Sequence, residues 1–76
     1  MMSKTEQAKT LFNNNKIKKS LKIFKGFDRV FTKDELKILG RTYEMFSNLR
    51  FYESLGFNFN DQLEKSMSII GTKYNI

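Results

Sequence analysis

The chain has 76 residues, enough for one domain whose core buries about 60% of the unfolded chain's surface. It contains neither cysteine nor histidine, which excludes disulfides and the two commonest zinc ligands, so we expect no metal and no cofactor. Small secreted scaffolds normally need such cross-links, and we therefore expect a cytoplasmic protein. No stretch has the roughly eighteen apolar residues of a membrane span, and residues 1–15 lack the apolar run of a signal peptide, so we expect no membrane partner.

The formal net charge is +6 and is unevenly distributed along the chain. Residues 1–38 carry ten basic and four acidic side chains, whereas residues 39–76 carry four of each. The segment 16–33 accounts for the whole excess, because it holds seven basic residues and a single acidic one, Asp28. The sequence therefore predicts one strongly basic face followed by a neutral C-terminal half.

Helices are predicted throughout, because the chain has no proline, only four glycines and apolar residues at spacings of three and four. Ser3-Lys4-Thr5-Glu6 is a capping box, which predicts a first helix as far as Phe12. Asn13-Asn14-Asn15 then predicts a turn, since asparagine tolerates left-handed backbone. A second helix is expected from about Lys16 to Gly26, with apolar residues on one face.

A second capping box, Thr32-Lys33-Asp34-Glu35, predicts a third helix that ends around Asn48. Residues 50–55 predict a short helical turn closed by a glycine, and residues 57–60 alternate apolar and polar types, which indicates extended chain or loop. Asn60 or Asp61 is then expected to cap a last helix. The sequence leaves open whether Gly71 ends that helix and whether Tyr74 and Ile76 dock the tail.

These elements predict an all-α fold in a single domain over residues 1–76. We expect four main helices in two antiparallel helical hairpins, at about 3–26 and 32–74, with a short extra helix or loop in the second. Small residues are expected where paired helices approach each other closely, at Ala8, Ser20, Gly40 and Ser66.

The two halves share a plan of capping box, helix, connection and helix. Leu36, Leu39, Gly40 and Tyr43 fit the first-helix pattern of the tetratricopeptide repeat, and Ser20 with Phe24 fits its second-helix pattern, so the chain resembles that family. Generic packing of helical hairpins would produce the same pattern. The resemblance implies a binding function rather than catalysis.

No catalytic constellation is apparent, because the usual general base and the strongest nucleophile are absent and the eight carboxylates are scattered. No phosphate-binding glycine pattern occurs either. The sequence therefore predicts a protein that is not an enzyme and has no catalytic residues.

The basic segment is the principal candidate binding surface. Lys18, Lys22, Lys25 and Arg29 recur at four, three and four residues, so they line one stripe if the second helix extends that far, and Lys19 lies beside them. Such a stripe attracts carboxylates or phosphates, and it also keeps a Phe-rich protein soluble. Our first hypothesis is a protein-interaction module that docks an acidic surface or peptide, as a small regulator or inhibitor such as a phage accessory protein. The alternative is nonspecific binding to RNA or DNA backbones, since lysine lacks the fork that reads guanine.

A second candidate surface is the aromatic cluster of Phe51, Tyr52, Phe57 and Phe59. We expect it to fill the core beneath the long connection, because aromatic residues are usually buried. If it is exposed instead, it forms a partner-binding or homodimer contact in which Arg50, Tyr52 and Tyr43 are the expected anchors.

Overall fold

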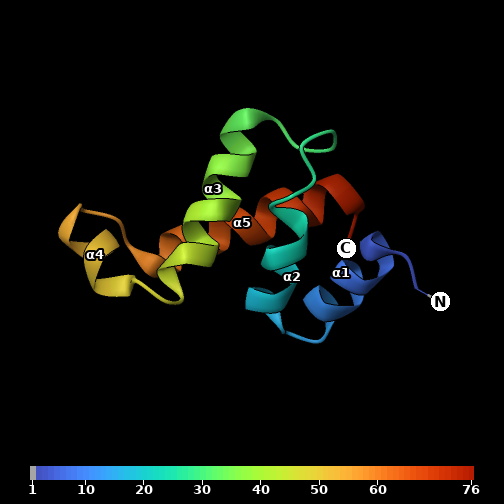
Figure 1. The fold of residues 1–76 in the computed structure, drawn as a ribbon, viewed down its shortest axis with the longest axis horizontal. Coiled ribbons are helices and arrows are strands. Elements are labelled where there is room, and N and C mark those ends of the chain that lie inside the picture. The colour runs from blue at the N-terminus through green and yellow to red at the C-terminus, as the bar shows by residue number, and fades with distance from the viewer. Residues whose placement is uncertain (1) are drawn as a thin grey trace.

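The computed structural model describes residues 2–76, and within that range the protein is all-helical. Five helices follow one another: α1 (Lys4–Asn13), α2 (Ile17–Phe24), α3 (Lys33–Met45), α4 (Leu49–Ser54) and α5 (Phe59–Tyr74). Helix α1 packs on α2, α2 packs on α3, and α3 packs on α5. Helix α4 makes its main helix contact with the end of α3 and projects at one end of the molecule, far from α1 (Figure 1).

The helix starts follow from local hydrogen bonds. Ser3 Oγ accepts a 3.1 Å bond from the backbone N–H of Glu6, so the serine half of the first capping box forms. At α3 the box is complete, because Thr32 and Glu35 each bond the other's backbone N–H. Both starts predicted from sequence are confirmed.

The predicted start of α5 is two or three residues too late. Asn58, rather than Asn60 or Asp61, is the N-cap, and its side-chain oxygen accepts a 2.9 Å bond from the Asp61 N–H. Phe59 then enters the helix instead of an extended segment. Its ring packs edge-on against Phe46 with centroids 5.1 Å apart, a contact with the end of α3 that the alternating pattern could not reveal.

The end of α2 differs from expectation, and the structure decides the end of α5, which the sequence left open. Helix α2 ends at Phe24, because the following turn closes through a bond from the Phe27 N–H to the Phe24 carbonyl, near the weak helix former Gly26. Helix α5 continues through Gly71 to Tyr74 and closes with Asn75 in the left-handed conformation at φ 58°. The tail does dock, because the Tyr74 ring lies 5.2 Å from that of Phe24.

The core joins four helices and the loop after α2. Phe31 reaches the core from the loop. The fully buried side chains of the core come from α1, α2, α3 and α5, and they are Ala8, Leu21, Phe24, Leu39 and Ile70. The small residues Ser20 and Ser66 are buried as expected. The prediction that Gly40 lies where two helices approach closely is wrong, because a Cβ atom added there would meet nothing within 4 Å. Its lack of a side chain therefore serves no close approach.

Candidate interaction surfaces

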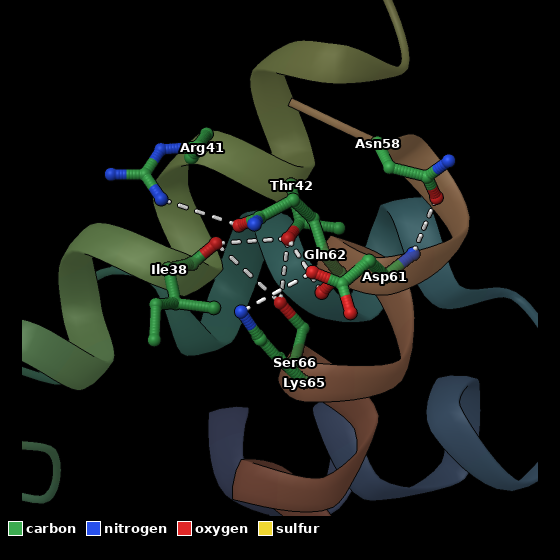
Figure 2. Close-up of polar contacts among 8 residues, drawn as sticks. All are labelled: Ile38, Arg41, Thr42, Asn58, Asp61, Gln62, Lys65 and Ser66. Atoms are coloured by element: carbon green, nitrogen blue, oxygen red, sulfur yellow. Dashed lines mark hydrogen bonds and ion pairs between the residues drawn. The ribbon is translucent and has the colours of Figure 1, made fainter. Parts of the chain in front are cut away.

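The densest polar cluster lies between α3 and α5, where Thr42, Gln62 and Ser66 converge (Figure 2). Ser66 Oγ donates to Thr42 Oγ1 over 2.7 Å, and Thr42 Oγ1 lies 2.9 Å from the Ile38 carbonyl and 3.1 Å from that of Gln62. Among the described residues, every buried side-chain polar atom has such a partner. The cluster is therefore a satisfied structural network that fixes α3 against α5.

Arg41 extends this network toward the connection that follows α4. Its Nη1 donates a 3.3 Å hydrogen bond to Gln62 Oε1, and its guanidinium lies 4.3 Å from the centroid of the Phe57 ring (Figure 2 shows the hydrogen bond). An arginine guanidinium stacked on an aromatic ring makes packing contact with the ring and is attracted electrostatically to its face. The contact ties the chain after α4 to the α3–α5 pair.

The predicted basic stripe is divided in space. Lys18 and Lys22 are exposed on α2, whereas Lys25 is the C-cap residue and its Nζ lies 5.1 Å from the centroid of the Tyr43 ring. Arg29 lies in the loop beyond the helix, so the four residues do not share one continuous helical stripe. The extension of α2 on which that stripe depended is wrong. Lys19 takes a more central place, because it lines two grooves.

The first groove, which we call the Phe46 groove, runs beside the start of α2 and encloses about 540 Å³. Its apolar lining is Ile17 from α2, Leu63 from α5 and Phe46, the C-cap residue of α3. Its polar edge consists of Asn15, Lys16, Lys18 and Lys19.

The second groove, the Leu11 groove, lies between α1 and α2 and encloses about 500 Å³. Leu11, Ile23 and Phe27 supply its apolar lining, and its remaining residues are Lys4, Gln7, Lys19, Lys22 and Gly26. Because Lys19 borders both grooves, the two apolar hollows adjoin across one lysine-rich ridge on α2.

The charges around these grooves are uncompensated. No carboxylate is among the described residues that line either groove. Within residues 2–76 the ion pairs join Lys65 to Asp61 at 3.2 Å and Lys73 to Glu35 at 3.9 Å, and both involve α5. The lysines of α2 are therefore solvated and available to an external anion.

The aromatic cluster only partly fulfils its expected role as core filler. Tyr52, Phe57 and Phe59 are half-buried, but Phe51 is 59% exposed, and α4 buries no residue fully. The reason is that α4 is short and has α3 as its main packing partner. Of the three expected anchors, Arg50 is exposed, and Tyr52 and Tyr43 are half-buried.

Sequence reasoning missed the grooves as sites. Ile17, Phe46 and Leu63 each fit the apolar face of their own helix at ordinary helical spacing, so nothing in the local pattern marked them as a shared groove. Their convergence depends on how three helices pack. Lys19 carried a signal only as a member of the charged segment.

Comparison of this chain with protein-family models, with curated proteins and with solved structures finds no match. Within the range 2–76 no three acidic side chains gather closely enough to hold a metal ion. No helix in that range combines the length and the apolar character needed to cross a membrane.

Proposed function

We propose that the protein is a non-enzymatic interaction module that docks an acidic, amphipathic segment of a partner protein on α2. The observation that carries this proposal is the pair of apolar grooves edged by lysines and lacking carboxylates. In this proposal α1 with α2 and α3 with α5 act as two helical hairpins of tetratricopeptide-like type, whose role is to hold the grooves. The protein would serve as a small cytoplasmic regulator of a larger complex.

The chemistry of the Phe46 groove defines the segment that it would accept. An apolar side chain buried against Ile17, Phe46 and Leu63 gains about 1.5–3 kcal/mol when fully removed from water. Aspartate or glutamate residues beside it would meet Lys16, Lys18 and Lys19 at the edge. Lysine is a flexible point charge, so it accommodates carboxylates in several geometries and accelerates association in a salt-dependent way.

A second candidate is nonspecific binding to RNA or DNA backbones through Lys18, Lys22, Lys25 and Arg29. The observation in its favour is that none of these four side chains forms an ion pair with another described residue. The apolar lining of the grooves favours the protein partner instead, because phosphate and sugar offer nothing to bury there. Backbone binding would be set by charge alone and would fall steeply with salt.

The test is affinity capture from a nuclease-treated lysate with three forms of the tagged chain: wild type, Lys19→Glu and Lys37→Glu. The two substitutions change net charge equally, but Lys37 is exposed on α3 and lines neither groove. We expect wild type and Lys37→Glu to recover the same acidic partner and Lys19→Glu to lose it. Equal recovery by all three forms would contradict the proposal.

The nucleic-acid candidate has its own measurement. A mobility-shift assay with mixed RNA and DNA at low salt, repeated at rising salt, reports backbone binding directly. The alternative is supported if binding of the nucleic acid weakens equally in Lys19→Glu and Lys37→Glu. It also requires that the captured protein is lost when the lysate is treated with nuclease. No shift at low salt removes it.

A further inference from the structure

Helix α2 separates the two grooves and borders both of them. It lies between α1 and α3 (Figure 1), with the Leu11 groove on its α1 side and the Phe46 groove beside its start. Lys19 lines both grooves, Lys18 lines only the Phe46 groove, and Lys22 lines only the Leu11 groove. We call these three exposed side chains the lysine ridge; an apolar hollow lies at either side of it.

The two hollows are too far apart for one side chain to fill both. Ile17 in the Phe46 groove and Ile23 in the Leu11 groove both belong to α2, and their spacing in the sequence corresponds to about 9 Å along the helix axis. On a partner helix, side chains one turn apart are separated by about 5–6 Å, whereas side chains two turns apart, or about seven residues, are separated by about 10.5 Å. A single helical segment therefore reaches both grooves only with anchors at least two turns apart.

The backbone on both sides of the Leu11 groove determines the conformation of such a segment. Both α1 and α2 are helices, so their N–H and C=O groups are bonded within each helix and offer no free edge that could pair with an extended chain. A segment that lies against them must satisfy its own backbone hydrogen bonds, and the α-helix is the element that does so within a single segment. The occupant that fits is a helix that crosses α2 obliquely, as packed helices do.

The charge of the lysine ridge determines what lies between the two anchors. Its three ammonium groups form no ion pair within residues 2–76, and no carboxylate lines either groove. In an ordinary amphipathic helix, the positions three and four residues after an apolar anchor are apolar as well. Here those positions face the ammonium groups, which favour carboxylates. The complementary segment is therefore apolar at two positions about two turns apart and acidic between them.

We propose that one helix of the partner protein crosses α2 and fills both grooves at once, with an apolar anchor in each groove and carboxylates over the lysine ridge between them. This inference rests on the proposed function, which requires only that an acidic, amphipathic segment docks on α2. It adds the number of anchors, their separation and the position of the charges. A segment with a single anchor loses the second, intramolecular contact and binds more weakly.

A displayed library of randomised helical segments of about fourteen residues, selected on the immobilised full chain, tests this pattern. We expect enrichment of sequences that have two large apolar residues two or three turns apart, with aspartate or glutamate between them. Enrichment of acidic sequences whose apolar residues lie within one turn would overturn this inference and leave the proposed function standing, because such a segment fills one groove only. Recovery of no acidic sequence would overturn both.

Charge reversal on each side of the lysine ridge tests whether one segment uses both grooves. Lys18→Glu alters the Phe46 groove alone and Lys22→Glu alters the Leu11 groove alone, and both residues are exposed on α2. Each substitution is expected to raise the dissociation constant of a selected peptide about three- to tenfold, measured by isothermal titration calorimetry. Lys37→Glu on α3 is the matched control, with the same change of charge and no expected effect. If only one of the two α2 variants binds more weakly, the peptide occupies one groove, so this inference fails while the proposed function survives.

Truncation of the peptide's anchors assigns each anchor to a groove. Replacing either anchor by alanine is expected to raise the dissociation constant about ten- to hundredfold. Ile23→Ala in the Leu11 groove should then be coupled to one anchor, and Leu63→Ala in the Phe46 groove to the other. Both side chains are half-buried, so circular dichroism must show that these variants stay folded; if either unfolds, the exposed Lys18 and Lys22 variants still decide the question. Coupling of both substitutions to the same anchor would show a single occupied groove and overturn the inference.

Discussion

The hydroxyl pair between α3 and α5 allows a quantitative test of the packing. A hydroxyl has one proton, so when Ser66 donates to Thr42, Thr42 donates onward to the carbonyl of Ile38 or Gln62. Thr42→Val keeps a similar shape but removes the acceptor of Ser66, which is left with the Ile38 carbonyl at 3.4 Å. Leaving a buried hydroxyl poorly paired costs about 1–3 kcal/mol of unfolding free energy.

Ser66→Ala is expected to cost less, about 0.5–1.5 kcal/mol, because Thr42 keeps two carbonyl acceptors. The double variant has no unpaired hydroxyl left. It should therefore be more stable than the sum of the two single losses predicts, by about 1 kcal/mol.

Urea unfolding of the four proteins, followed by far-ultraviolet circular dichroism, measures these differences. With a denaturant slope of about 1 kcal/mol/M for a small domain, each 1 kcal/mol moves the midpoint by about 1 M. If the two losses add within about 0.3 kcal/mol, the hydroxyls are not coupled, and the close contact between α3 and α5 that underlies this reasoning is refuted.

Further predictions concern four single substitutions. Gly40→Ala is expected to raise the unfolding free energy by about 0.5–1 kcal/mol, since the added methyl group meets nothing. Gly56→Ala should lower the unfolding free energy, because Gly56 has a φ of +94°. Thermal melts that rank the two variants in the opposite order would contradict the structure. Thr32→Ala should cost about 1 kcal/mol in urea unfolding, because it removes the Thr32 half of a complete capping box, and a cost near zero would mean that the box contributes nothing. Burial raises the pKa of the Tyr74 phenol above its ordinary value of 10.0. The stability that this group contributes is complete below pH 10.0 and is lost as pH rises through the folded-state pKa. Wild type should therefore lose more stability than Tyr74→Phe between neutral pH and the alkaline range, and parallel pH profiles would show that Tyr74 is not desolvated.

The features that the sequence determined are those that depend on neighbours a few residues away. Ser3 and Thr32 cap their helices through backbone groups three residues ahead, so their positions in the sequence were enough to locate two helix starts. The all-helical class follows equally from apolar spacing and from the absence of proline. The net charge of residues 16–33 is obtained by counting side chains in the sequence, so it needs no structure.

The features that only the tertiary structure decided depend on distant residues. Phe59, at the start of α5, packs against Phe46 at the end of α3, and Phe51 is exposed because α4 has α3 as its main packing partner. The two grooves are the main case. Residues 17, 46 and 63 look like ordinary core positions until three helices meet, because a local pattern fixes which face of a helix is apolar but not which part of that face the neighbouring helices leave uncovered.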